Sequence, residues 1–341
     1  MAAGLVAVTG ATGFLGRHLV RELATAGYRV RILARRDVIH PLWRDLEVEV
    51  VLGDLGDERA LDRLCRDAGL VVHAAGLTKA RTAAAFAAVN VEGARRVAER
   101  TSGRMLLVSS LTAREPSISD YGASKRGGED AARAVLGERL GVVRPPALYG
   151  PDDPETLPLF KLAASSPILP LLDPRARIAM MHVADAARQI AALAKAPGGF
   201  NVALCDQRPE GYSWREVFQT AAEIFGASPA YLRIPGFALR AVAAAGLLAP
   251  RSGAAPMISF GKVREISHLD WSVRPEEQMS DLPAPLFDLA RGFLHSVQGY
   301  EASGVIFGKP AAIREKMLQT YSADGVKYAT FADDRSRGTH L

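Results

Sequence analysis

The chain has 341 residues, which is enough for one large domain or two smaller ones. Its hydrophobic content of 48% and charged content of 23% are ordinary for a globular protein. The net charge of +5 is spread along the chain, and no block of Lys and Arg is interleaved with aromatic residues. We therefore expect no nucleic-acid partner, while attraction to an anionic cofactor or membrane stays compatible with the charge.

The two cysteines, Cys65 and Cys205, have no Cys or His partner at metal-ligand spacing, so we expect no metal site. They are typical of reduced thiols in a cytoplasmic protein. The N-terminus has no basic segment and no cleavage site, which argues against a signal peptide. No apolar run approaches the roughly 20 residues that span a bilayer. We expect a cytoplasmic location.

The segment LVAVTGATGFLG near the N-terminus predicts nucleotide binding. An apolar strand at 4–9 runs into a glycine-rich turn, which opens a helix at 14–26. Gly10 allows a tight turn, Gly13 removes a Cβ where backbone approaches a diphosphate, and Gly16 lets the helix pack closely on the sheet. The helix N-terminus then presents free N–H groups and a positive dipole end to the phosphates.

Strands and helices alternate through the first half of the chain. We expect short apolar strands at 4–9, 29–34, 47–52, 70–74, 104–109 and 141–144. We expect helices at 14–26, 57–68, 82–100 and 122–138. This alternation predicts an α/β fold of the Rossmann type, with a doubly wound parallel sheet that binds ligands at the carboxyl ends of its strands.

After Pro145 prolines become frequent, and the pattern indicates a smaller and less regular lobe. We expect helices at 184–196, 213–226 and 285–298, a strand near 199–203, and a capping box opened by Ser213 and Glu216. The predicted domains are a nucleotide-binding Rossmann domain at 1–150, a substrate lobe at 151–300 with some chain crossing between the two, and a C-terminal extension at 301–341.

Three side chains predict the chemistry. Tyr121 and Lys125 lie four residues apart and share one face of a helix. A tyrosine has an ordinary pKa of about 10, and a nearby ammonium lowers it by stabilising the phenolate. Ser110 ends the strand at 104–109, where it can hydrogen-bond a substrate carbonyl while Tyr121 passes a proton to the oxygen.

With these motifs in family order, the chain resembles an extended short-chain dehydrogenase/reductase, the superfamily that includes NAD-dependent epimerases and dehydratases. The resemblance covers roughly residues 4–300. The matching segments are TGATGFLG (9–16), GDL (53–55), HAAG (73–76), NVEG (90–93), VSS (108–110), YGASK (121–125), RPPALYGP (144–151) and HVAD (182–185).

The resemblance implies roles for several residues. Ser110, Tyr121 and Lys125 match the catalytic triad, and Asn90 lies behind the active site. The loop between Ser110 and Tyr121 is shorter than in many relatives, so the resemblance does not predict how this loop covers the substrate. The cofactor-binding residues that we expect are Gly10, Thr12, Gly13, Phe14, Leu15, Gly16, Arg35, Arg36, Asp54, Leu55, Ala74, Ala75, Gly76, Tyr121, Lys125 and Pro145.

Within this set, Asp54 and Leu55 are expected to flank the adenine, and Pro145 to lie near the nicotinamide. Ala74, Ala75 and Gly76 are expected to line the path of the cofactor. By the same resemblance His182 packs beneath the pocket and Asp185 caps the following helix.

The end of the second strand bears on the cofactor. An NAD-selective site usually ends this strand in Asp or Glu, which binds the ribose 2′-OH. Here the strand ends at Ala34, and Arg35 and Arg36 follow. A guanidinium suits a 2′-phosphate through charge and paired donors. We therefore expect NADP(H), while Asp37 leaves NAD(H) open.

The second lobe favours an apolar substrate. Residues 234–249 are nearly all apolar and resemble a helix of hydroxysteroid dehydrogenase-like and dihydroflavonol reductase-like members. We expect a pocket-lining helix, with an interfacial helix at a membrane surface as the alternative. The function expected is reduction of a ketone, or oxidation of the alcohol, on a bulky apolar substrate such as a steroid, isoprenoid or 3-oxo-sphingolipid/ceramide. A nucleotide-sugar epimerase, a non-catalytic NADP(H)-binding subunit and a homodimeric assembly are left open.

Overall fold

The computed structural model describes residues 4–36, 40–235 and 260–306. Asp37, most of the apolar segment at 234–249 and most of the extension at 301–341 therefore lie outside the described residues.

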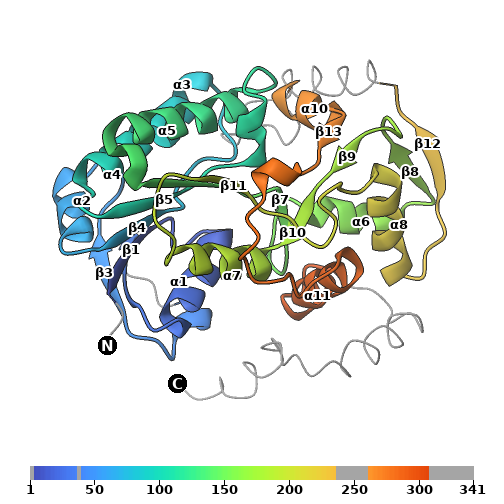
Figure 1. Cartoon of the computed structure of the whole chain (residues 1–341). Helices are drawn as coiled ribbons and strands as arrows, with labels where there is room; N and C mark the ends of the chain where they lie inside the picture. Colours follow the sequence, from blue (N-terminus) through green and yellow to red (C-terminus); the bar gives the residue numbers. More distant parts are fainter. Residues whose placement is uncertain (1–3, 37–39, 236–259, 307–341) are drawn as a thin grey trace.

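A seven-stranded parallel sheet forms the centre of the larger lobe (Figure 1), as the alternating pattern predicted. Its strand order is β11-β6-β5-β4-β1-β2-β3. The strands are β1 (Leu5–Thr9), β2 (Arg29–Ala34), β3 (Val48–Leu52), β4 (Leu70–His73), β5 (Arg104–Val108), β6 (Leu140–Arg144) and β11 (Asn201–Ala203). The order reverses between β1 and β4, so the carboxyl ends of these two strands open the crevice in which such sheets bind ligands.

Helices cover both faces of this sheet (Figure 1). On one face α1 (Phe14–Thr25) packs against α7 (Val183–Leu193). On the other face lie α2 (Glu58–Cys65), α4 (Glu92–Arg100) and α5 (Asp120–Leu136). Each helix buries one apolar stripe against strands that are apolar on both sides, which is what a doubly wound sheet requires.

The helix expected at 82–100 is interrupted. A short α3 (Ala83–Phe86) passes into a π-helical turn at Ala87–Val91, and α4 follows. A π turn adds one residue to a helical turn and often marks a functional site. Here it carries Asn90, which is buried.

The chain beyond β6 builds the smaller lobe, although α7 and β11 return to the larger one. Its helices are α6 (Leu157–Ser165), α8 (Trp214–Ile224), α10 (Phe260–Ser267) and α11 (Leu289–Ala302). Its strands pair as β7 (Ala147–Tyr149) with β10 (Met180–His182), β8 (Ile168–Leu171) with β12 (Ala230–Arg233), and β9 (Arg177–Ile178) with β13 (Asp270–Trp271).

Short 3-10 helices lie in both parts of the chain, at Pro41–Trp43, Leu111–Arg114, Gly137–Arg139 and Pro275–Glu277. The division at residue 150 stays a prediction.

Local signals account for the ends of two helices in this lobe. The capping box of Ser213 and Glu216 is present at the start of α8. The last helix begins at Leu289 rather than at 285, because the side chain of Asp288 caps it by accepting from the Arg291 N–H.

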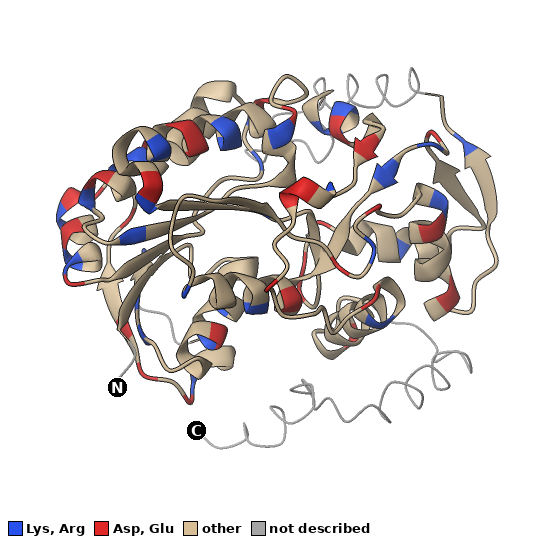
Figure 2. Ribbon diagram, in the orientation of Figure 1, with Lys and Arg blue, Asp and Glu red and all other residues tan. Residues whose placement is uncertain are grey.

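Lys and Arg residues alternate with Asp and Glu residues over much of the part of the chain that the structure describes (Figure 2). Figure 2 shows basic and acidic residues interspersed over the outer helices, whereas the strands of the central sheet are mostly uncharged. Over the described part of the chain, no helix is both long and apolar enough to cross a bilayer.

Candidate active site

The glycine-rich turn between β1 and α1 has the geometry of a phosphate cradle. Gly10 adopts a φ of +71°, and a Cβ on it would lie 2.5 Å from the backbone N of Ala75. A Cβ on Gly16 would collide with the backbone of Gly10. Thr12 and Gly13 are exposed at the outer edge of the turn. Larger residues would therefore break the turn at Gly10 and Gly16, while Gly13 leaves its backbone open to a ligand.

The first turn of α1 is open to an anion. Gly13 is the N-cap residue and brings no side chain to cap the helix. Phe14 and Leu15, the first two helical residues, are half-buried. A helix N-terminus of this kind binds phosphate through its N–H groups and its dipole. The residues present fit a dinucleotide diphosphate.

The end of β2 presents two cations. Ala34 is buried, and Arg35 and Arg36 follow it as exposed side chains. They lie beyond the carboxyl end of a strand that neighbours β1, on the same edge of the sheet as the glycine-rich turn.

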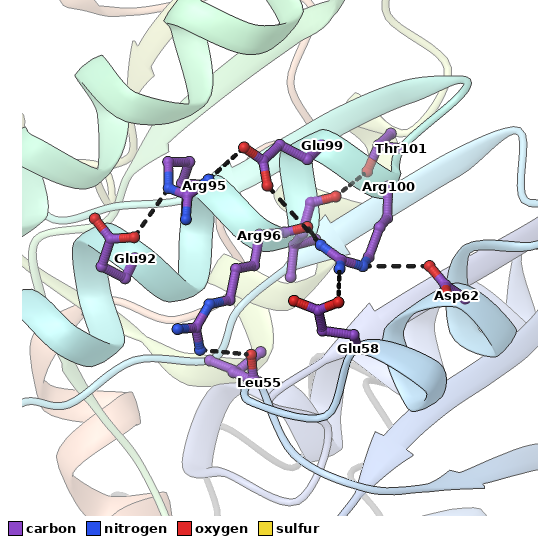
Figure 3. A network of polar contacts seen from close by, with 10 residues as sticks. Leu55, Glu58, Asp62, Glu92, Arg95, Arg96, Glu99, Arg100 and Thr101 are labelled. Atoms are coloured by element: carbon purple, nitrogen blue, oxygen red, sulfur yellow. Dashed lines mark hydrogen bonds and ion pairs between the residues drawn. The ribbon is translucent and has the colours of Figure 1, made fainter.

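The loop after β3 is held by α4 (Figure 3). Arg96 donates to the carbonyl of Leu55 at 3.5 Å, and the Leu55 side chain packs directly over Gly93. Asp54 is exposed, and its carboxylate accepts from the Gly56 N–H at 2.7 Å. Leu55 is therefore fixed from the helix side.

In the same region α4 is tied to α2 by ion pairs (Figure 3). Arg100 contacts Glu58 and Asp62, each at 3.2 Å. Arg95 pairs with Glu92 at 2.9 Å and with Glu99. All the partners except Arg100 are largely exposed, so each pair adds little stability on its own.

The segment after β4 crosses from the phosphate cradle to the lysine. Ala74 donates its N–H to the carbonyl of Thr9 at 3.2 Å, and Ala75 donates to the Thr9 hydroxyl at 3.3 Å. A Cβ on Gly76 would lie 3.6 Å from the Nζ of Lys125. A ligand that follows this segment thus passes from the glycine turn to Lys125.

Ser110, Tyr121 and Lys125 come together at the carboxyl end of β5. The Ser110 side chain lies close enough to that of Tyr121 to lower the tyrosine pKa. Lys125 donates from Nζ to the carbonyl of Val108 at 2.7 Å. Pro145 is buried next to them, and its carbonyl accepts from the Leu111 N–H at 2.9 Å.

Burial decides the protonation of this group. It raises the pKa of Tyr121 to about 12, and the neighbouring Ser110 side chain opposes that rise only in part. The net shift is therefore upward, whereas we expected a downward shift from the neighbouring lysine. Burial also lowers the pKa of Lys125 to about 8, against the field of Glu129. Tyr121 is therefore a neutral phenol at physiological pH and retains a proton to donate.

Asn90 braces the helix that carries the tyrosine. Its amide exchanges two hydrogen bonds with the backbone of Leu77, at 2.7 and 3.0 Å, and donates to the Ser124 hydroxyl at 2.9 Å. Ser124 in turn donates to the carbonyl of Tyr121 at 2.8 Å. The π turn thus directs Asn90 between the segment after β4 and α5.

The expectation for Asp185 is wrong. The residue that caps α7 is His182, whose Nδ1 accepts from the Ala184 N–H at 3.2 Å. Asp185 instead accepts from the N–H groups of Leu286 and Phe287, each at 2.9 Å. It therefore fixes the chain that leads into α11.

Sequence reasoning missed two buried carboxylates near the site. Glu129 lies four residues after Lys125 on α5, so the spacing of Tyr121, Lys125 and Glu129 could have found it. Glu265 comes from α10 of the other lobe and accepts from Ser119, the N-cap residue of α5. No local sequence pattern predicts the contact between Ser119 and Glu265.

One open hollow lies away from this chemistry. It has a volume of about 870 Å³ and is lined by residues at the amino ends of β1, β2 and β3, including Leu5, Arg29 and Val48. Ligands of doubly wound sheets bind at the opposite, carboxyl edge.

The fold and the site define a Rossmann-type NAD(P)-dependent oxidoreductase. A family model described as "NAD dependent epimerase/dehydratase family" matches residues 6–203. The chain belongs to this family.

Among curated proteins the chain is 51% identical over 307 residues to the "Ceramide reductase" of Caulobacter vibrioides, covering 89% of this chain and 96% of that one. It is 30% identical over 223 residues to "NADH dehydrogenase [ubiquinone] 1 alpha subcomplex subunit 9, mitochondrial" of Dictyostelium discoideum, covering 62% of each chain. The solved structure of gox2253 superposes with a TM-score of 0.70 at 21% identity, covering 90% of this chain and all of that one. That likeness shows the shared fold.

Proposed function

We propose that this protein reduces the ketone group of a ceramide-class lipid with NADPH. The observation that carries the proposal is the 51% identity to a ceramide reductase along 89% of the chain. The gathering of Ser110, Tyr121 and Lys125 at the strand ends supports it, because these groups suit carbonyl reduction.

Each of the three side chains has a role in this reaction. NADPH, when bound, supplies the hydride that adds to the carbonyl carbon. The Ser110 hydroxyl hydrogen-bonds the carbonyl oxygen and holds it beside the phenol. Tyr121 donates its proton to that oxygen as negative charge develops there. Lys125, as an ammonium, stabilises the phenolate that Tyr121 leaves.

The protonation of Tyr121 is what reduction requires, and the ordinary tyrosine pKa of about 10 would already meet that requirement. Its raised pKa, about 12, keeps the phenol protonated at physiological pH, as a proton donor requires. Oxidation of the alcohol would instead need a phenolate as the base.

Arg35 supports NADPH as the cofactor. It is exposed just beyond β2, where an acidic residue would otherwise bind a ribose 2′-OH. We propose that Arg35, with Arg36 beside it, contacts the 2′-phosphate through charge-assisted hydrogen bonds.

The retained Tyr121 and Lys125 favour an enzyme over a subunit that only holds the cofactor. A nucleotide-sugar epimerase is the remaining alternative, since the same three groups serve both reactions. The two differ in turnover: a reductase releases oxidised cofactor in every cycle, whereas an epimerase returns the hydride to its substrate.

The experiment is to mix purified protein with NADPH and either an oxo-ceramide or a panel of nucleotide sugars, and to follow absorbance at 340 nm. The proposal predicts protein that purifies largely free of cofactor and consumes one NADPH for each oxo-ceramide reduced. NAD that survives gel filtration, with sugar isomers interconverting and no net change at 340 nm, would overturn it.

A ceramide-class substrate resides in a bilayer, so we further propose that the protein works at a membrane surface. The apolar run at 234–249 supports this, although most of it lies outside the described residues. Co-sedimentation with vesicles of phosphatidylglycerol and ceramide tests it, and protein that stays in the supernatant would contradict it.

A further inference from the structure

A buried ion pair lies directly behind the proposed catalytic lysine. Glu129 on α5 is 3% exposed, and both its carboxylate oxygens are bound by Arg144 at the end of β6. The guanidinium donates from Nε to Oε1 at 2.8 Å and from Nη2 to Oε2 at 2.6 Å. This two-point geometry fixes the carboxylate more firmly than a single contact does.

The same carboxylate also holds the end of β5. Ser109 donates its hydroxyl to Glu129 Oε1 at 2.5 Å and its backbone N–H to the Val143 carbonyl at 2.7 Å. Ser109 lies between Val108, whose carbonyl binds Lys125, and Ser110. Glu129 therefore joins α5, β5 and β6 at the point where the reacting groups emerge.

Glu129 also acts on Lys125 through its charge. Two titratable groups near the ammonium are neutral near pH 8: His73 of β4 has a pKa lowered by burial to about 3, and Tyr121 has one raised to about 12. Among the described residues, Glu155 and Glu265 are the carboxylates that act on Tyr121. Burial lowers the pKa of Lys125 to about 8, and the field of Glu129 opposes that effect. Arg144, which binds the same carboxylate, offsets part of that field.

We propose that Glu129 is a positioning residue, which keeps Lys125 charged at neutral pH and fixes the strand end that carries Ser110. The proposal rests on the proposed function, because it needs Lys125 and Ser110 in their assigned roles. Without Glu129, burial alone would set the protonation of the lysine, and part of the protein would carry an uncharged amine at physiological pH.

The test is a lysine-selective NMR titration of the cofactor-free full chain, with the Lys125 signal assigned by Lys125→Arg. In the wild-type protein we expect Lys125 to titrate near pH 8. Glu129→Gln, which keeps the shape and removes the charge, should lower that pKa by about one unit or more. Asp130→Asn is the matched control, since Asp130 is the next residue on α5 and is exposed, and it should leave the titration unchanged.

Glu129→Gln leaves Arg144 buried without its partner, so the variant can fail to fold. The double variant Glu129→Gln/Arg144→Gln removes both charges and leaves two amides that can bond each other. It should also lower the Lys125 pKa, but by less than Glu129→Gln does, because the positive charge of Arg144 is lost as well. A folded variant, single or double, that titrates with the wild-type pKa would overturn the proposal.

The pH dependence of ketone reduction distinguishes a failure of the Glu129 proposal from a failure of the proposed function. The high-pH limb of kcat/KM for ketone reduction should move to lower pH by the shift seen in the NMR titration. The NMR titration of Lys125 needs no substrate. If Glu129→Gln lowers the Lys125 pKa but the wild-type protein reduces no lipid ketone, the role of Glu129 would be supported and the proposed substrate would be wrong. An unmoved high-pH limb in an active Glu129→Gln variant would overturn the role of Glu129.

Discussion

Thr112 holds the side chain of Ser110, the residue that follows β5, by donating to its oxygen from the hydroxyl at 2.9 Å and from the N–H at 3.3 Å. Tyr121, in the first turn of α5, lies close enough to feel this Ser110 side chain, which lowers the tyrosine pKa. Ser110 is thus fixed before any substrate arrives. A preorganised donor of this kind is effective because it needs no reorganisation during the reaction.

Replacing Ser110 with alanine should therefore lower kcat by about 10²–10³-fold, the usual cost of removing one such donor. Binding of NADPH should stay within about twofold of wild type, because Ser110 is assigned to the substrate. Steady-state kinetics and fluorescence titration measure the two effects. Ser117→Ala, an exposed serine in the same loop, is the control. A kcat near that of wild type in Ser110→Ala would remove Ser110 from the mechanism.

The cofactor preference should depend on Arg35. One charge-assisted hydrogen bond contributes about 1.5–3 kcal/mol, so Arg35→Ala should weaken NADPH binding roughly tenfold or more. The affinity for NADH, which has no 2′-phosphate, should hardly change. Dissociation constants for both cofactors measure the ratio, and Arg59→Ala on α2 removes the same exposed charge elsewhere as a control. An unchanged ratio in Arg35→Ala would contradict the assignment.

Stability should fall in mild acid because buried histidines stay neutral in the folded protein. Burial lowers the pKa of His18 and His73 to about 3, that of His295 to about 4, and that of His182 well below 6.5. The unfolded chain binds protons at these sites below about pH 6.5 and the folded protein does not. The contribution of each is therefore complete above pH 6.5 and falls by about 1.4 kcal/mol per pH unit below it.

Urea unfolding between roughly pH 7 and pH 5 measures this dependence. Asp206 opposes it, because burial raises the pKa of that carboxyl to about 6 and so favours proton uptake by the folded protein. His295→Gln isolates one histidine, since glutamine can still accept a bond from His182. The variant should lose about 1.4 kcal/mol per pH unit from the slope, and His268→Gln serves as the comparison. An unaltered slope in His295→Gln would contradict the argument.

The sequence predicted the sheet well because its signals are local. Each strand is a short apolar run, and the turn after β1 needs glycine at Gly10 for its positive φ and at Gly16 for close packing. Tyr121 and Lys125 could be paired in advance because four residues on a helix fix their common face.

Features that depend on tertiary contacts could not be predicted. The π turn at Ala87–Val91 places Asn90, but no residue type in that stretch predicts a π turn. The contact between Glu129 and Arg144 needs the register of β5 on β6 and the placement of α5 above both. The raised pKa of Tyr121 follows from burial, which spacing along a helix does not reveal.

Proton donation by Tyr121 is the central claim, and a single-turnover experiment with oxo-ceramide and saturating NADPH tests it most directly. The Tyr121→Phe variant keeps the ring that packs against Phe86 at a centroid distance of 5.9 Å and loses only the hydroxyl. We predict that NADPH binding and the melting temperature stay close to wild type while the rate of NADPH oxidation falls about 10²–10⁴-fold. A Tyr121→Phe protein that reduces the ketone at nearly the wild-type rate would contradict the mechanism.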